Sequence, residues 1–351
     1  MKRLLALVVL SAALAAGPAR AQVNVKIGVL SDMSSLYSDI GGPGSVTAAN
    51  MAIADFTAKH PNVKVELVSG DHQNKADVGS SLANQWYDVD KVDMIIDVPN
   101  SGVALAVSQV ANQKNRVFIV SGAAASDLTG PKCNANTVHW TYDTWMLANG
   151  TGKSMVKTGG DTWFFLTSDY AFGYALERDT AAAVEAGGGK VLGKVRHPIN
   201  TSDFSSFLLQ AQASKAKVIG LANAGGDTIN SIKQAAEFGI VKGGQSLAGL
   251  LVFASDVAAL GLPTAQGLVL TETWYWDAND ANREWTKRWQ QERPGKIPTM
   301  VQAGVYSGVT HYLKAVAALN STADGKAVVA KMKELPTDDP LFGKGVVRAD
   351  G

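Results

Sequence analysis

The feature that most constrains this 351-residue chain is an alternation of strand-like and helix-like segments that runs through the sequence twice. Short stretches rich in Val, Ile and Leu alternate with longer stretches whose apolar residues recur at helical spacing. Strands that are apolar on both faces and alternate with helices are typical of parallel sheets covered on both sides. The sequence therefore predicts an α/β fold with two such sheets in series. The first run predicts strands at 25–30, 63–68, 92–98 and 117–120 and helices at 45–59, 79–89 and 103–113. The second run predicts strands at 163–166, 191–195, 218–222 and 250–253 and helices at 172–186, 204–213 and 228–238.

The segment after residue 270 predicts that the chain passes between the two units more than once. Helices are expected at 281–292 and 302–319, and the second has no strand of its own to cover. We therefore expect it to return to the first unit, which makes the connection a multi-segment hinge. The expected boundaries are 22–141 plus 276–331 for the N-terminal lobe and 142–272 plus 335–351 for the C-terminal lobe.

The last residues also carry an expectation. Residues 343–348 read as a strand, and Asp350-Gly351 is a strong hairpin-turn signal that no return strand follows. We expect the chain to be incomplete at its C-terminus, and a frayed end is the alternative.

The first 21 residues have the pattern of a secretory signal peptide. Lys2 and Arg3 precede an apolar run at 4–16, and Ala19-Arg20-Ala21 matches a small-residue cleavage site. The apolar run is too short for a comfortable membrane span, although an N-terminal membrane anchor is the alternative. We therefore expect cleavage after Ala21 and a mature protein in the periplasm.

Composition and motifs argue against several classes of function. The 32 basic and 31 acidic residues give no electrostatic reason to expect a nucleic-acid partner. The single cysteine, Cys133, excludes an internal disulfide framework, and it is either a small buried residue or a thiol whose partner is missing. The five histidines show no metal-ligand spacing, and no nucleophile elbow is visible. We expect no catalytic residues, no metal and no cofactor.

A series of segments resembles a known family. The chain is similar to the type I periplasmic solute-binding proteins of ABC importers, in the branched-chain amino-acid (Leu/Ile/Val-binding) family. The resemblance covers essentially the whole mature chain and implies two Rossmann-like lobes, a three-segment hinge and a ligand cleft between the lobes. The segments that carry it are KIGVLSDMSSLYSDIGGPGSVTAANMAIADF, DVPNSG, VSGAAASDLTG, SDYAFGYALERD, NTSDFSSFLLQAQ and ANAGGDTINSIKQAAEFG.

The resemblance also implies ligand-binding residues. In the first lobe it places Asn100, Ser101 and the run Ala123, Ala124 and Ala125 around a ligand carboxylate. The family usually has a hydroxyl in the second of these loops, where this chain has Ala124 and Ala125. That departure predicts weak recognition of an ordinary amino-acid ammonium group.

Other positions of the expected cleft come from both lobes. The loop after the first strand contributes Tyr37 and Asp39, and Asp256 is the candidate partner for an ammonium group. The aromatic wall is expected from Tyr170 or Phe172 and from Trp274 or Tyr275. Asn223 opens the loop after strand 218–222, and ligands of open parallel sheets bind at such strand ends. Turn, cap and core roles are the alternatives for Asn100, Asp256 and the aromatic residues.

The expected function is that of a receptor without chemistry. It captures a small organic solute, either an amino acid or an aromatic or other carboxylic acid, and delivers it to inner-membrane ABC permease subunits. We expect a monomer that closes by hinge motion. A ligand-sensing module for a signalling receptor and a secreted α/β hydrolase are the alternatives, and the hydrolase would need a nucleophile or a metal in the cleft.

Overall fold

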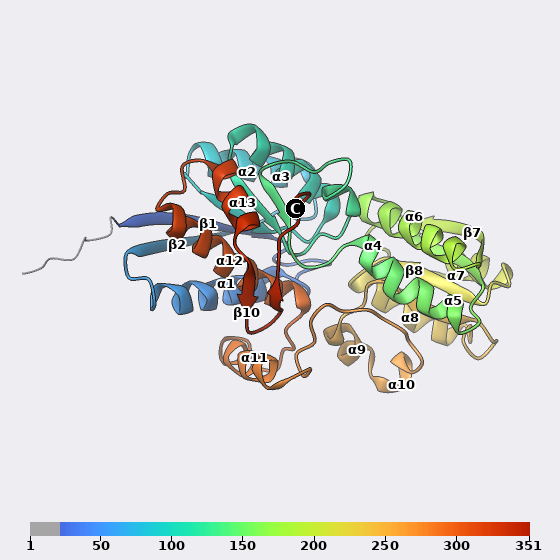
Figure 1. The fold of residues 1–351 in the computed structure, drawn as a ribbon. Helices are drawn as coiled ribbons and strands as arrows, with labels where there is room; N and C mark the ends of the chain where they lie inside the picture. Colours follow the sequence, from blue (N-terminus) through green and yellow to red (C-terminus); the bar gives the residue numbers. More distant parts are fainter. Residues whose placement is uncertain (1–21) are drawn as a thin grey trace, which may run out of the picture.

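Two α/β lobes lie side by side in the computed structural model, which describes residues 22–351 (Figure 1). The predicted signal peptide lies outside the described residues. The first lobe is built on a five-stranded parallel sheet of order β2-β1-β3-β4-β5. Its strands are β1 (Val23–Ser31), β2 (Val63–Asp71), β3 (Met94–Asp97), β4 (Val117–Val120) and β5 (Thr137–His139).

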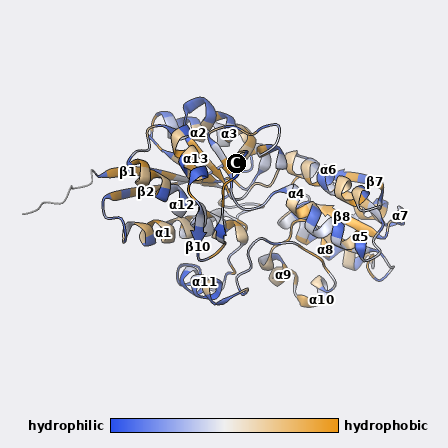
Figure 2. Cartoon of the chain, viewed as in Figure 1, coloured by the Kyte–Doolittle hydropathy of each residue, from blue (hydrophilic) through white to orange (hydrophobic). Residues whose placement is uncertain are grey.

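Helices cover both faces of this first sheet because its strands are apolar on both sides. One face packs on α1 and α12, and the other packs on α2 and α3. Figure 2 shows the apolar strands inside and the polar helix faces outside. The helices of this lobe are α1 (Gly42–Thr57), α2 (Ala76–Asp88), α3 (Ser101–Lys114), α11 (Asp280–Glu292), α12 (Met300–Leu319) and α13 (Gly325–Glu334), with the short 3-10 turn η1 (Ser126–Leu128).

The second lobe has a four-stranded parallel sheet of order β7-β6-β8-β9. Its strands are β6 (Thr162–Ser168), β7 (Lys190–His197), β8 (Val218–Ala222) and β9 (Ser246–Gly249). Its helices are α4 (Thr144–Leu147), the π-helical turn η2 (Ala148–Gly152), α5 (Lys153–Lys157), α6 (Ala171–Ala186), α7 (Ser205–Ala213), α8 (Gly226–Glu237), α9 (Ala254–Leu260) and α10 (Leu262–Ala265). The predicted α/β fold with two parallel-sheet lobes is confirmed.

The chain crosses between the lobes twice within the described residues. It leaves the first lobe between β5 and α4 and returns between α10 and α11, after which α12 packs on α1 and β3. The expected return of the helix near residue 302 to the first lobe is therefore confirmed.

The C-terminal segment stays with the first lobe. It forms the antiparallel ribbon β10 (Thr337–Asp339) and β11 (Gly343–Gly345) directly after α13. The hydroxyl of Ser307 in α12 donates to the Asp339 carboxylate at 2.7 Å, and the His139 backbone N–H donates to the Gly351 carbonyl at 2.8 Å. The expected place of 335–351 in the C-terminal lobe is therefore wrong, because the ribbon folds back and makes these hydrogen bonds to α12 and β5.

Some local expectations fail for physical reasons. No strand forms at 250–253, since β9 pairs with β8 at 246–249 and the apolar run that follows is a fully buried loop. Cys133 is exposed, so the interpretation of a buried thiol is wrong. Within residues 22–351, no helix has both the length and the apolar character needed to cross a membrane.

Candidate functional site

Loops at the carboxyl ends of strands from both lobes enclose a small central cavity. It leaves only about 10 Å³ of free volume, roughly what one water molecule needs. The cavity therefore represents a closed arrangement of the lobes. Its lining residues are Tyr37, Ile40, Pro99, Gly122, Ala124, Tyr142, Tyr170, Phe172, Ala224 and Leu251.

Two tyrosines join the lobes across this cavity. The phenolic oxygens of Tyr37 in the first lobe and Tyr170 in the second lie 2.6 Å apart, within hydrogen-bond distance. The backbone N–H of Tyr37 donates to the Asp32 carboxylate at 2.8 Å, which holds its loop in place. Burial raises the pKa of both phenols, so both remain protonated at neutral pH.

The lobes also touch through the backbone next to the tyrosine pair. Gly225 has φ +58°, and a Cβ on it would lie 2.7 Å from the Leu36 carbonyl oxygen of the other lobe. A side chain at this position would therefore force the two loops apart. Glycine at residue 225 permits the close approach of the lobes.

The Ser101 hydroxyl at the start of α3 is placed to donate to an anion. Its oxygen accepts from the backbone N–H groups of Ala124 and Ala125 at 3.3 Å and 3.2 Å, so its own proton is available to donate. Ser101 is the first residue of α3, where backbone N–H groups and the helix dipole favour negative charge. Asn100 caps the same helix, since its side-chain oxygen accepts from the N–H groups of Gly102 and Val103.

Asp97 lies behind the loops that follow β3 and β4. It is fully buried at the end of β3 and accepts a hydrogen bond from Ser31 at 2.7 Å. Burial raises its pKa to about 6. Asp97 and Val98 have φ values of +91° and +54°, which is an uncommon conformation for a β-branched valine. Backbone strain of this kind persists only where surrounding contacts impose it, and it concentrates at binding sites.

Asn223 and Asp227 serve their own lobe. The Asn223 side chain is fully buried between the His197 ring at 3.2 Å and the Thr228 hydroxyl at 2.7 Å. Asp227 accepts from the backbone N–H groups of Asn200 and Thr201, and burial raises its pKa to about 6. Both residues therefore position the second-lobe loop that carries Ala224.

Asp39 and Asp256 line a separate crevice of about 180 Å³ between the lobes. Asp39 is exposed and pairs with Lys296 at 3.2 Å. Asp256 is buried in the first turn of α9 and accepts from the Phe253 backbone N–H. Burial raises the pKa of Asp256 to about 6 and that of Glu272, on the second crossover, to about 7.

The predicted residues thus fall into three groups. Trp274 is buried edge-on against Trp285 at 5.5 Å and lines neither cavity. Asp39 and Asp256 share the separate crevice. The remaining residues lie at or directly behind the central cavity, namely Tyr37, Asn100, Ser101, Ala123, Ala124, Ala125, Tyr170, Phe172 and Asn223.

Sequence reasoning missed several residues of the cavity wall. Tyr142 lines it and donates to the Gly122 carbonyl at 2.7 Å, and its closeness in sequence to Trp140 and Trp145 was the available signal. The other missed lining residues, which carry no chemical signature, are Ile40, Pro99, Gly122, Ala224 and Leu251.

A polar network links the lobes near the first crossover. The Asp179 carboxylate of α6 accepts from the hydroxyls of Ser126 and Thr144, each at 2.6 Å. Arg178 pairs with Asp127 of the first lobe at 3.1 Å. The two lobes are therefore held together at two places, at this network and at the tyrosine pair.

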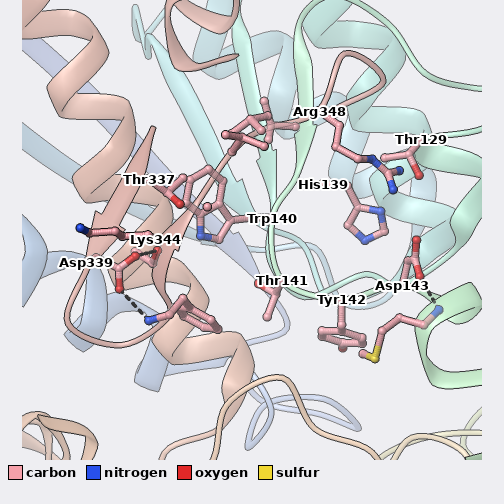
Figure 3. A pocket seen from close by; sticks show the side chains of 18 of the residues that line it. Thr129, His139, Trp140, Thr141, Tyr142, Asp143, Thr337, Asp339, Lys344 and Arg348 are labelled. Carbon is pink, nitrogen blue, oxygen red and sulfur yellow. Dashed lines mark hydrogen bonds between the residues drawn. The ribbon is translucent and has the colours of Figure 1, made fainter. Parts of the chain in front are cut away.

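A more spacious cavity lies elsewhere, between the first crossover and the C-terminal ribbon. It has a volume of about 450 Å³, and Figure 3 shows His139 and Asp143 on one side, Asp339 and Lys344 on the other, and Trp140 between them. None of the predicted ligand-binding residues lines it. Among residues 22–351, no group of three or more His, Cys, Asp or Glu side chains is arranged to hold a metal ion.

Comparison with known proteins agrees with this architecture. A family model described as periplasmic binding protein matches residues 24–351. A periplasmic binding protein from Burkholderia mallei is 54% identical, with a TM-score of 0.90 over 94% of this chain and 87% of that chain. A branched chain amino acid ABC transporter periplasmic ligand-binding protein from Burkholderia xenovorans LB400 is 39% identical, with a TM-score of 0.81 over 93% of this chain and 87% of that chain.

A more distant structure shares the fold alone. It is the solute binding protein of an ABC transporter from R. palustris in complex with 4-hydroxybenzoate, which is 23% identical, with a TM-score of 0.84 over 92% of this chain and 88% of that chain. The family model, in contrast, spans nearly the whole sequence. This chain therefore belongs to the periplasmic binding protein family, whose members bind solutes and are not enzymes.

Proposed function

We propose that this protein is a periplasmic receptor that captures a small carboxylic acid between its lobes and delivers it to an ABC permease. The observation that carries the proposal is the central cavity, whose apolar wall at Ala124 adjoins the start of α3, where the Ser101 hydroxyl accepts from the N–H groups of Ala124 and Ala125 and has its own proton to donate. Small-ligand sites are mostly apolar and use a few well-placed polar groups to orient the ligand. The relative from Burkholderia xenovorans supports the link to an ABC transporter.

The closed cavity implies that capture needs hinge motion. A free volume of about 10 Å³ cannot hold an acid of the size of leucine or benzoate. The lobes therefore open to admit the ligand and close on it, and the permease recognises the closed form. The apolar residues Ala124 and Ala125 favour an acid without an ammonium group. The expected signal peptide at 1–21 accounts for export, and the expected state is a monomer.

Thermal unfolding of the mature protein, stripped of co-purified ligand by unfolding and refolding, tests the proposal. The panel holds leucine, valine, benzoate and 4-hydroxybenzoate. A ligand at 1,000 times its dissociation constant stabilises the protein by about 4 kcal/mol, which shows as a clear rise in Tm. Ser101→Ala should weaken this rise, and Ser205→Ala, on the outer helix α7, should not. A stripped protein that none of these acids stabilises would contradict the proposal.

A further inference from the structure

The tyrosine pair holds one hydrogen-bond donor more than it uses. Tyr37 and Tyr170 each carry one O–H group, and the two groups share the single contact of 2.6 Å. Only one of them donates in that contact, and neither phenol has another hydrogen-bond partner among residues 22–351. One O–H proton is therefore left over, and a buried donor without an acceptor is costly.

The surroundings of the pair offer this proton no acceptor side chain among the described residues. The polar side chains of the cavity wall come from three tyrosines, and the third, Tyr142, already donates to the Gly122 carbonyl. The rest of the wall consists of apolar side chains and glycine. No carboxylate of residues 22–351 lines this cavity, because Asp256 faces the separate crevice. An oxygen atom on a ligand would satisfy the spare donor, whereas an ammonium group would not.

The two ends of the cavity follow strands that are not neighbours in the sheet. Tyr37 follows β1, and Ala124 follows β4, with β3 between the two strands. Neighbouring strands are about 4.8 Å apart, so the two loops leave the sheet about 10 Å apart. A planar acid that bears a second oxygen opposite its carboxylate can span this distance with a hydrogen bond at each end.

We propose that Tyr37 and Tyr170 determine specificity by recognising a second oxygen atom, a hydroxyl or a carbonyl, at the end of the ligand far from its carboxylate. This inference rests on the proposed function, because it takes the carboxylate to be held at Ser101 and Ala124. When the lobes close on such a ligand, its oxygen inserts between the two phenols. The 2.6 Å contact between the phenols marks the place where this oxygen would enter.

Calorimetric titration of the refolded protein with three benzoates tests the inference. The probes are 4-hydroxybenzoate, benzoate and 4-methylbenzoate, and the methyl compound matches the hydroxyl in size without its hydrogen bond. We expect 4-hydroxybenzoate to bind about ten- to hundredfold more tightly than 4-methylbenzoate, the range that an unpaired buried donor produces. In the double variant Tyr37→Phe, Tyr170→Phe, the ratio should fall to about threefold or less, with benzoate still bound.

Two further variants separate the effect of these two hydroxyl groups from unrelated effects of a Tyr→Phe substitution. Tyr174→Phe makes the same change on α6 outside the cavity, where the hydroxyl bonds to Asp169, and it should keep the full ratio. Tyr170→Phe alone should lower the ratio if the double variant folds poorly.

The outcomes separate this inference from the proposed function. Equal binding of the hydroxyl and methyl compounds by the wild type overturns the inference but leaves the proposed function intact. Retention of the preference by the double variant overturns the inference as well. If none of the benzoates binds but leucine does, the inference fails while a receptor for another acid remains, and failure of every acid overturns both.

Discussion

At the scale of single residues, Asp97 combines full burial, a left-handed backbone and no cationic partner within hydrogen-bond distance among the described residues. Its raised pKa means that the native state binds a proton more tightly than the unfolded chain does. The stabilisation from that proton is complete below the ordinary pKa of 3.8 and is lost as pH rises through about 6. At neutral pH the ionised Asp97 therefore lowers the free energy of unfolding, while its side chain supports the loops beside the cavity.

Replacing Asp97 with Asn should remove this pH dependence. The difference between a pKa of about 6 and one of 3.8 corresponds to about 3 kcal/mol. As pH rises from 4 to 7.5, the free energy of unfolding of the Asp97→Asn variant should therefore increase relative to that of the wild type by up to about 3 kcal/mol. Urea unfolding at several pH values measures it. The exposed Asp77→Asn serves as the control and should track the wild type throughout. A difference between Asp97→Asn and wild type that is constant with pH would contradict the assignment.

The predicted site residues show what a sequence reveals at this scale. Tyr37, Ala124 and Tyr170 line the central cavity, and Ser101 lies behind Ala124, because all four follow strands whose places along the chain could be predicted from the sequence. Asp256 could not be placed in the same way. Its carboxylate accepts from the N–H group at the start of α9, and an aspartate that caps a helix cannot be told from one that binds a ligand by residue type and position in the first turn alone.

At the scale of elements, the contact between α6 and η1 is a polar link between the lobes, in addition to the tyrosine pair. Asp179 is only 11% exposed and accepts two hydroxyl hydrogen bonds, and hydrogen bonds to a charged group are stronger than neutral ones. Breaking this link removes one of the two contacts that hold the closed form together, while the sheet of each lobe keeps its own hydrogen bonds. Ligand affinity depends on how easily the closed form is reached, so it should respond to this link.

Asp179→Asn should therefore lower ligand affinity by about five- to tenfold, which corresponds to about 1–1.4 kcal/mol. The variant keeps the shape of the side chain and removes its charge. Calorimetric titration with the ligand identified in the screen measures the change. Asp161→Asn is the control, since Asp161 pairs with Lys217 inside the second lobe at 2.9 Å, and its affinity should be unchanged. Equal losses in both variants would show that the lobe contact has no special role.

Element prediction succeeded where the hydrophobic period was long and failed where segments were short. The helices of the two α/β runs and strand β8 lie within a few residues of their expected places. The three-residue strand β5 and the short helix α9 gave too little periodicity to detect. The ribbon at 337–345 depends on contacts with α12, which is close in space but distant in sequence, so the local hydrophobic pattern could not predict it.

At the scale of the whole molecule, buried acids and buried histidines oppose one another as pH changes. Burial raises the pKa of five carboxyl groups, to about 6 for Asp97, Asp227 and Asp256, to about 7 for Glu272, and above its ordinary value for Asp93. Four imidazoles have a lowered pKa because they are buried, namely His72 at about 4, His139, His197 and His311. On acidification from pH 7 to pH 5, the native state gains protons on the acids and the unfolded state gains them on the histidines. The acids therefore stabilise the fold as pH falls, and the histidines destabilise it.

The free energy of unfolding should consequently change by less than about 2 kcal/mol between pH 5 and pH 7. Glu272→Gln removes one proton-binding acid, so its stability should decline toward pH 5 more steeply than that of the wild type. Denaturant unfolding at pH 5, 6 and 7 measures both profiles. A wild-type profile that rises or falls steeply across this range would indicate that one of the two groups dominates.

The exposed thiol of Cys133 lies on a loop that takes part in the contact between the lobes. The thiol is exposed on the loop after η1, and it is the only sulfhydryl in the sequence. Two hydrogen bonds tie that loop down, from Lys132 N–H to the Asp127 carbonyl and from Cys133 N–H to the Gly130 carbonyl, and Asp127 in turn pairs with Arg178 across the lobes. Thiol chemistry can thus attach a fluorophore at one defined point beside the moving contact, without any engineered cysteine. A dye sensitive to its surroundings would then report ligand capture as a change in emission, which makes the native sequence a ready scaffold for an optical biosensor.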